Sequence, residues 1–169
     1  HLRVNEGRKF HELNKVDFSK SIPATEIDSK LKGLKWITPP FKDNIEEEIN
    51  FIKDLKSQIQ TDKRKKMVIT HYSFISSILD ENFFSPSMAY TSDGSIIPLK
   101  NNKYSQKYKN LVINLIKKNN VDVIYIVYPV HKGSIADYLD KSCLKEKLIL
   151  KGVISYEIKR CKDFIGKNN

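Results

Sequence analysis

Two continuous apolar runs are the clearest feature of the hydrophobic pattern, and both have the length of a strand. Met67–Thr70 and Val121–Val127 are almost unbroken by polar side chains, and the second is rich in β-branched and aromatic residues. Such runs are typical of strands that are covered on both faces of a sheet. Leu34–Thr38, which two prolines follow, and the alternating stretch Gly152–Ile158 predict two more strands, the last of them at an edge.

Apolar residues spaced three and four apart predict helices between these strands. Asp43 and Glu46 form a capping-box pair that opens the first long helix, whose stripe is Ile45, Ile49, Ile52, Leu55 and Ile59. The stripe of a second long helix, which Asn119-Asn120 ends, is Tyr104, Tyr108, Leu111, Val112, Leu115 and Ile116. Shorter helical pieces are expected at Arg8–Leu13, from Thr25 to a stop at Gly33, and at Phe74–Leu79 and Ile135–Leu139.

Strands that alternate with helices imply parallel pairing through right-handed crossovers. We therefore expect an α/β fold of three-layer Rossmann-like or flavodoxin-like type, with a mostly parallel sheet and helices on both faces. Residues 24–165 are expected to form one domain, and residues 1–23 a lead-in or stalk. The predicted buried residues are Ile49, Ile52, Val68, Ile69, Leu111, Leu115, Val123, Ile124 and Ile126.

Charge and composition narrow the classes of function. The chain of 169 residues carries a net charge of +10 and is 40% hydrophobic and 30% charged, as a globular domain is. Almost all of its cations are lysines, which disfavours nucleic-acid binding because base and phosphate recognition favours arginine. The one dense basic run, Lys63–Lys66, reads as a polar connector or as a patch for anionic lipid. No stretch is apolar enough to span a bilayer, and a start at His1 suggests a piece of a longer chain.

Candidate binding residues follow two of the predicted strands. In open α/β sheets, ligands bind beyond the carboxyl ends of the strands. If Met67–Thr70 and Val121–Val127 are neighbours, their following segments meet in one crevice, over which a residue of the long 80–102 loop could close. The crevice residues are His71, Tyr72, His131, Lys132 and Ser134, with Asp93 on the loop.

The residues of this crevice could also have purely structural roles. Gly133 and Ser134 with Lys132 could seat an anion at a helix start, or could simply cap that helix. His71 is a general-base candidate, but a hydrogen bond to a loop carbonyl explains it as well. Trp36 could cover a sugar, or belong to a core. Phosphate-loop and dinucleotide motifs, a nucleophile elbow around Ser73 and a carboxylate pair are absent, so no cofactor is expected.

Two cysteines stand late in the chain, at Cys143 and Cys161. They bracket a predicted helix-to-strand connection. Free buried thiols and a disulfide in an oxidising compartment both fit this placement. A metal site does not, because the four ligands that it needs are not nearby.

Four stretches carry a resemblance to a known group of proteins. They are Leu34-Lys-Trp-Ile-Thr-Pro39, Lys66-Met-Val-Ile-Thr-His-Tyr-Ser-Phe-Ile75, Tyr90-Thr-Ser-Asp-Gly94 and Asn119-Asn-Val-Asp-Val-Ile-Tyr-Ile-Val127. From about Arg8 onward the chain resembles the C-terminal soluble region of bacterial polytopic membrane proteins that are grouped with glycosyltransferases using lipid-phosphate sugar donors.

The resemblance implies a non-catalytic, extracytoplasmic (periplasmic) accessory domain near a membrane surface. Its partners would be the transmembrane part of the parent chain and an acceptor glycan or lipid-linked sugar. The catalytic acid would lie in a loop between membrane helices, outside this sequence, and Cys143 and Cys161 would then be bridged. The alternative is a stand-alone α/β sugar- or nucleotide-binding protein or enzyme that uses the crevice.

Overall fold

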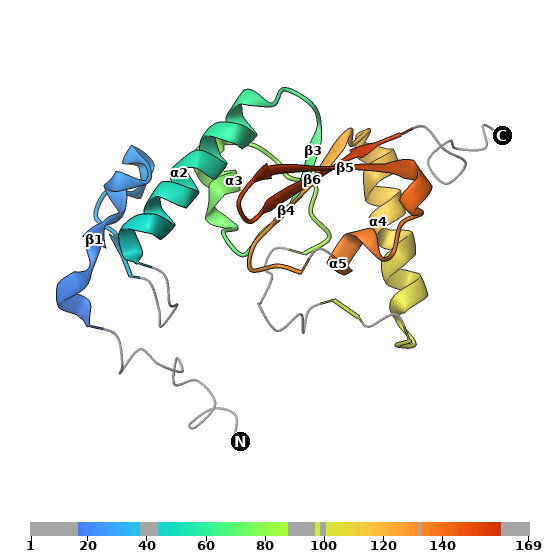
Figure 1. The fold of residues 1–169 in the computed structure, drawn as a ribbon, viewed down its shortest axis with the longest axis horizontal. Coiled ribbons are helices and arrows are strands. Elements are labelled where there is room, and N and C mark those ends of the chain that lie inside the picture. The colour runs from blue at the N-terminus through green and yellow to red at the C-terminus, as the bar shows by residue number, and fades with distance from the viewer. Residues whose placement is uncertain (1–16, 38–43, 88–96, 99–100, 132, 160–169) are drawn as a thin grey trace, which may run out of the picture. The chain divides into compact units, whose positions relative to one another are not determined.

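The computed structural model describes residues 17–37, 44–87, 97–98, 101–131 and 133–159, without the side chains of Gly133 and Ser134 (Figure 1). These residues belong to two compact units, one ending at Gln60 and the other beginning at Thr61. This boundary lies inside the range that the sequence pattern assigns to one domain. No helix within the described ranges has both the length and the apolarity that crossing a bilayer requires.

The first unit holds short elements and one long helix. Its elements are three 3₁₀ turns, η2 (Phe18–Lys20), η3 (Ala24–Glu26) and η4 (Ser29–Leu31), two strands, β1 (Ile22–Pro23) and β2 (Lys35–Trp36), and helix α2 (Ile45–Thr61). The strands pair antiparallel, with Ile22 opposite Trp36. The expected central strand at Leu34–Thr38 is therefore wrong: its described part is one arm of a small separate sheet.

The helix expected from Thr25 to Gly33 is also wrong. The carboxylate of Asp28 accepts from the N–H of Lys30, which favours a capped 3₁₀ turn over a continuous helix. Gly33 then takes a φ of +87°, a left-handed conformation that suits glycine.

Helix α2 confirms the apolar stripe at its buried positions. Ile49, Ile52, Leu55 and Ile59 are all buried. The Asn44 side chain accepts from the N–H of Glu46 at 3.2 Å, so the helix begins at Ile45. The other capping residue expected from the sequence, Asp43, lies outside the described residues.

The second unit is built on a four-stranded mixed sheet, and this overturns the predicted fold class. Its strands are β3 (Lys66–Ile69), β4 (Val123–Val127), β5 (Leu144–Leu150) and β6 (Val153–Ile158), in the order β3-β4-β6-β5. Only β3 and β4 are parallel, whereas β6 is antiparallel to both of its neighbours. The structure is therefore not a three-layer, mostly parallel Rossmann-like or flavodoxin-like fold.

A tight reversal before β6 is the physical reason for this difference. A parallel sheet needs a crossover connection before each strand. Here the chain turns directly from β5 into β6 at residues 151–152, where Gly152 has a φ of +88° (Figure 1). The result is a hairpin with Leu144 opposite Ile158, which the charged Lys-Glu-Lys centre of β5 concealed in the sequence.

The helices of this unit are α3 (Phe74–Leu79), α4 (Ser105–Asn119) and α5 (Gly133–Ala136), and a 3₁₀ turn, η5 (Lys141–Cys143), precedes β5. Helix α3 has the predicted bounds. Helix α5 starts and ends earlier than the predicted Ile135–Leu139 and is a single turn.

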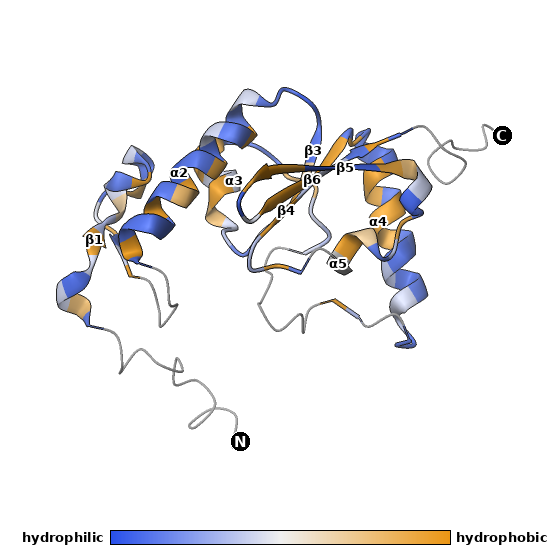
Figure 2. Ribbon diagram, in the orientation of Figure 1, coloured by the Kyte–Doolittle hydropathy of each residue, from blue (hydrophilic) through white to orange (hydrophobic). Residues whose placement is uncertain are grey.

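The core of the second unit lies around β4 and α4. In Figure 2 the central strands are hydrophobic, whereas hydrophobic and hydrophilic stretches alternate along α4. On α4, Val112 and Ile116 are the buried residues. The predicted burial of Leu111 is wrong, because it lies one position off this face and is 45% exposed, and Leu115 is only half-buried. The other seven predicted core residues are buried: Ile49, Ile52, Val68, Ile69, Val123, Ile124 and Ile126.

Candidate functional site

The edge where β3 and β4 end brings two of the predicted crevice segments together. These strands pair in parallel, with Ile69 opposite Ile126, so their carboxyl ends share one edge of the sheet. His71 follows the end of β3 and His131 follows the end of β4, and both are exposed. The neighbouring strands on which the predicted crevice depends are therefore present.

Tyr72 differs from the two histidines in its surroundings. It is buried, and its N–H donates to Oγ1 of Thr70 at 2.9 Å. Its ring stands edge-on to the His71 ring, with 5.2 Å between centroids, and to the Phe74 ring at 6.3 Å. Tyr72 is thus an interior residue whose ring packs against that of His71.

The rest of the predicted crevice stays a prediction. Asp93 and Lys132 lie outside the described residues, as does the side chain of Ser134. The helix that was expected to offer its N-terminus to an anion is the four-residue turn α5. A single turn aligns few peptide dipoles, so the amides there offer less to an anion than a full helix would.

The cysteine pair stays a prediction as well. Cys143 is buried at the start of β5, whereas Cys161 lies outside the described residues. The connection between them is the β5–β6 hairpin, not the expected helix-to-strand connection. The N–H of Lys159 donates to the carbonyl of Cys143 at 2.8 Å, so the chain leaves β6 beside Cys143.

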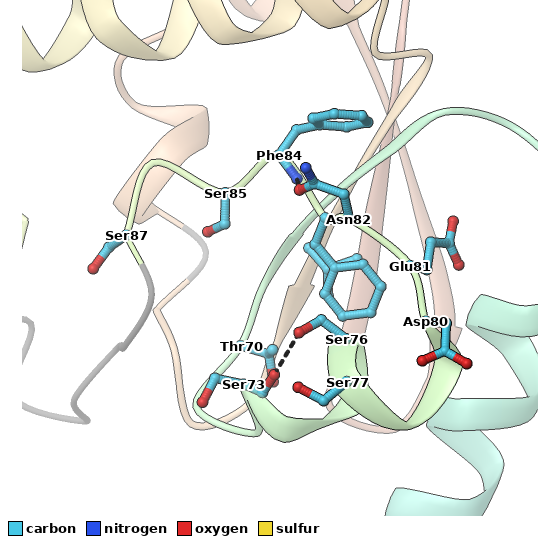
Figure 3. Close-up of a pocket in the computed structure, with 12 residues that line it drawn as sticks. Thr70, Ser73, Ser76, Ser77, Asp80, Glu81, Asn82, Phe84, Ser85 and Ser87 are labelled. Atoms are coloured by element: carbon cyan, nitrogen blue, oxygen red, sulfur yellow. Dashed lines mark hydrogen bonds between the residues drawn. The ribbon is translucent and has the colours of Figure 1, made fainter.

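A pocket of about 360 Å³ opens beside α3, on the segment that follows β3 (Figure 3). Its described lining residues come from the stretch 68–87 in the second unit. We call it the serine pocket, because five of them are serines. The lining consists of Val68, Thr70, Ser73, Ser76, Ser77, Asp80, Glu81, Asn82, Phe83, Phe84, Ser85 and Ser87.

Helix α3 and its N-cap residue, Ser73, place three of the serines along the pocket. Ser76 donates its hydroxyl to the carbonyl of Ser73 at 2.9 Å, the bond drawn in Figure 3. Asp80 ends the helix in a left-handed conformation with a φ of 51°, and its N–H reaches the carbonyls of Ser76 and Ser77. This tight stop turns the chain back, so that residues 81–87 form the opposite part of the lining.

Two interactions attach this returning segment to β3. The ammonium of Lys66, whose side chain is only 2% exposed, pairs with the carboxylate of Glu81. Two residues further along β3, the N–H of Val68 donates to the carbonyl of Phe83 at 3.2 Å. The pocket wall is therefore held to the sheet by a partly buried ion pair and a backbone hydrogen bond.

Phe84 completes the wall in an unusual conformation. Its φ is 47°, which is uncommon for a bulky residue and costs about 1–3 kcal/mol. Its N–H donates to Oδ1 of Asn82 at 2.9 Å, and its ring packs against the hydrophobic core. These contacts hold the backbone in that conformation.

Sequence reasoning did not single out Ser76, Ser77, Asp80 or Asn82. Serines in a short helix and an Asp-Glu-Asn run after it are typical of a helix end and a turn. One available signal was their place, after a buried strand and at the start of a long loop, where ligands of α/β proteins bind. Trp36, the sugar-stacking candidate, lies in the first unit and donates from Nε1 to Glu48 at 3.1 Å.

A charged cluster joins the connector before β3 to the sheet. Asp62 accepts from Arg64 and, at 2.5 Å, from the hydroxyl of Tyr125 on β4, while Arg64 also reaches Glu157 on β6. Burial raises the pKa of Asp62, but the hydrogen bonds from Arg64 and Tyr125 outweigh it and hold that pKa well below its usual range. Burial and the bond to Asp62 raise the pKa of Tyr125 to about 12. The cluster therefore stabilises the fold as charged Asp62 and neutral Tyr125.

Within the described ranges, no three or more His, Cys, Asp or Glu residues gather where they could hold a metal ion. Comparisons of the chain with protein-family models, with curated proteins and with solved structures found no match.

Proposed function

We propose that this chain is a non-catalytic, extracytoplasmic accessory domain of a membrane glycosyltransferase-like protein. Its role would be to contact an acceptor glycan or the head of a lipid-linked sugar at the edge where β3 and β4 end. The observation that carries the binding role is the parallel pairing of these strands, which puts the segments with His71 and His131 at one edge. The four stretches described from the sequence supply the link to a membrane glycosyltransferase.

Weak contact, not turnover, is the expected activity of the isolated chain. His71 and His131 are both exposed, so a ligand at this edge would stay largely hydrated. A ligand that keeps most of its water gains little binding free energy beyond the cost of being immobilised. In the proposed parent protein, the transmembrane part would supply the catalytic acid.

Titration of the ¹⁵N-labelled chain with inorganic phosphate and with a short-chain polyprenyl-phosphate analogue tests the edge. We expect amide shifts at His71, Tyr72 and His131, and weaker shifts in a His71→Ala variant. The matched control is His11→Ala, which removes a histidine from a distant part of the sequence. Silent amides at all three positions would contradict binding there, and turnover of a sugar substrate by the chain alone would contradict the non-catalytic role.

A further inference from the structure

We propose that the serine pocket is a second binding site, which takes a neutral polyhydroxylated ligand such as a single sugar ring. Its lining includes none of the residues of the proposed phosphate edge, namely His71, Tyr72, His131, Lys132 and Ser134. It would therefore bind its ligand whether or not that edge binds phosphate.

The polar groups of the lining are suited to ligand hydroxyl groups. Serine hydroxyls both donate and accept hydrogen bonds, as sugar hydroxyls do. Asn82 uses Oδ1 to accept from Phe84, and its amide NH₂ is a hydrogen-bond donor. The carboxylates of Asp80 and Glu81 add acceptors that pair with hydroxyl donors.

The charge of the described lining disfavours phosphate. Among the described lining residues, the charged ones are Asp80 and Glu81, both acidic. Lys66 pairs with Glu81. An anion placed there would meet like charge, whereas a neutral ligand has no such penalty.

The size and the apolar wall fit one ring. A volume of about 360 Å³ lies at the small end of the range of small-molecule pockets, which is about 300–1,000 Å³. Val68 and Phe83, both buried, add apolar side chains to the lining. Such a wall covers the C–H face of a sugar ring, while the serines take its edge.

The wall is arranged before any ligand arrives. The left-handed residues Asp80 and Phe84 bracket the returning segment, and the bonds of Lys66 and Val68 attach it to β3. Little ordering is then left for a ligand to bring about. Because Ser73, Ser77 and Asn82 are exposed, the ligand stays partly in water, and a Kd on the order of 1 mM is expected.

Amide-shift titration of the full chain with methyl glucoside, methyl galactoside and methyl mannoside tests the proposal. At least one of them should saturate shifts within residues 73–87, while phosphate at the same concentration leaves these amides unmoved. Ser77→Ala should weaken this binding about fivefold, the effect of one lost hydrogen bond. Asn82→Asp keeps the acceptor for Phe84 and removes the donor, so it should weaken binding by a similar factor.

The matched control is Ser29→Ala, an exposed serine in the first unit, which should leave the shifts and the Kd unchanged. No saturable shift with any of the three glycosides, or equal competition by ethanolamine, would overturn the proposal. Phosphate shifts at His71 and His131 without glycoside shifts at 73–87 would overturn the serine pocket alone. The reverse result would overturn the phosphate edge alone.

Discussion

The two edge strands of the four-stranded sheet differ in whether their charged side chains are buried or exposed. At one edge, all four residues of β3 are buried, and this includes Lys66, which pairs with Glu81. At the other edge, β5 carries Lys145, Glu146 and Lys147 in exposed positions. Within the part of the chain that the structure describes, β3 and β5 each pair with one strand, but a returning segment bonds to β3 through Phe83.

The difference shows how covering an edge changes what a lysine does there. A buried ammonium without its partner costs several kcal/mol, so Lys66 makes the sheet depend on Glu81. An exposed lysine is hydrated and adds little to stability, yet it keeps an open edge from pairing with another chain. A lysine thus makes a structural contact at β3, whereas at β5 it disfavours pairing with another chain.

Removing Glu81 should break the covered edge with the largest effect. Glu81→Gln leaves the ammonium of Lys66 buried without a carboxylate, and we expect a loss of about 3–5 kcal/mol in the free energy of unfolding. Urea denaturation followed by circular dichroism measures it.

The converse variant is the control for this reading. Lys66→Met replaces the buried ammonium with an apolar chain of similar shape and leaves Glu81 partly exposed to water, so the expected loss is much smaller. Equal losses in the two variants would show that the cost does not come from an unpaired buried lysine.

A Cys143–Cys161 disulfide would tie the start of the open edge to the chain after β6. We expect mass spectrometry after alkylation without reductant to find no labelled cysteine. A reductant should then lower the free energy of unfolding by about 2–4 kcal/mol. Two labelled thiols in freshly purified protein would contradict both the bond and the extracytoplasmic assignment.

The charged cluster between the edges gives a pH test. Asp62 has a lowered pKa in the folded protein, so its contribution is present above its ordinary pKa of about 4 and is lost as the pH falls below that value. Asp62→Asn should cost about 1–3 kcal/mol near pH 7.

Thermal unfolding from pH 7 down to pH 2 measures this linkage. The variant should lose less stability over the acid range than the parent chain does, because the group that titrates is gone. Parallel curves would place the acid sensitivity elsewhere. At high pH, the raised pKa of Tyr125 predicts a stability contribution that is lost between about pH 10 and 12.

The open edge should show the smallest change in stability and a change in association instead. Lys147→Val would extend the apolar end of β5 next to Leu148, which is already 68% exposed. We expect a shift in unfolding free energy within about 0.5 kcal/mol, together with self-association in sedimentation equilibrium. Lys147→Glu keeps a charge and should remain as the parent chain is. A monomeric Val variant would show that Lys147 does not guard the edge.

The parts of the fold that the sequence predicted are those with strong local patterns. The apolar runs located β3 and β4, and the stripe from Ile49 to Ile59 located α2. The mixed sheet was missed because pairing direction depends on a reversal at Gly152 and on β5, whose Lys-Glu-Lys centre lacks an apolar run. Exposed edge strands give a weak hydrophobic signal because they carry charged side chains.

The site was predictable only as far as strand adjacency. The placement of His71 and His131 at one edge follows from the parallel β3–β4 pair, which two similar apolar runs indicated. The serine pocket was not predicted, since it depends on the left-handed turn at Asp80 and on the long-range bond between Lys66 and Glu81. Neither leaves a periodic trace in the sequence.

The hydrogen bond from Val68 to Phe83 makes the Val68 amide a probe of how the pocket wall opens. An amide hydrogen in such a bond exchanges with solvent only when the bond opens. The exchange rate of the Val68 amide in deuterated buffer therefore reports the opening of the segment 81–87 away from β3. The neighbouring amides of β4 report the slower opening of the sheet itself. The ratio of the Val68 exchange rate to theirs therefore distinguishes local opening of the pocket wall from unfolding of the sheet.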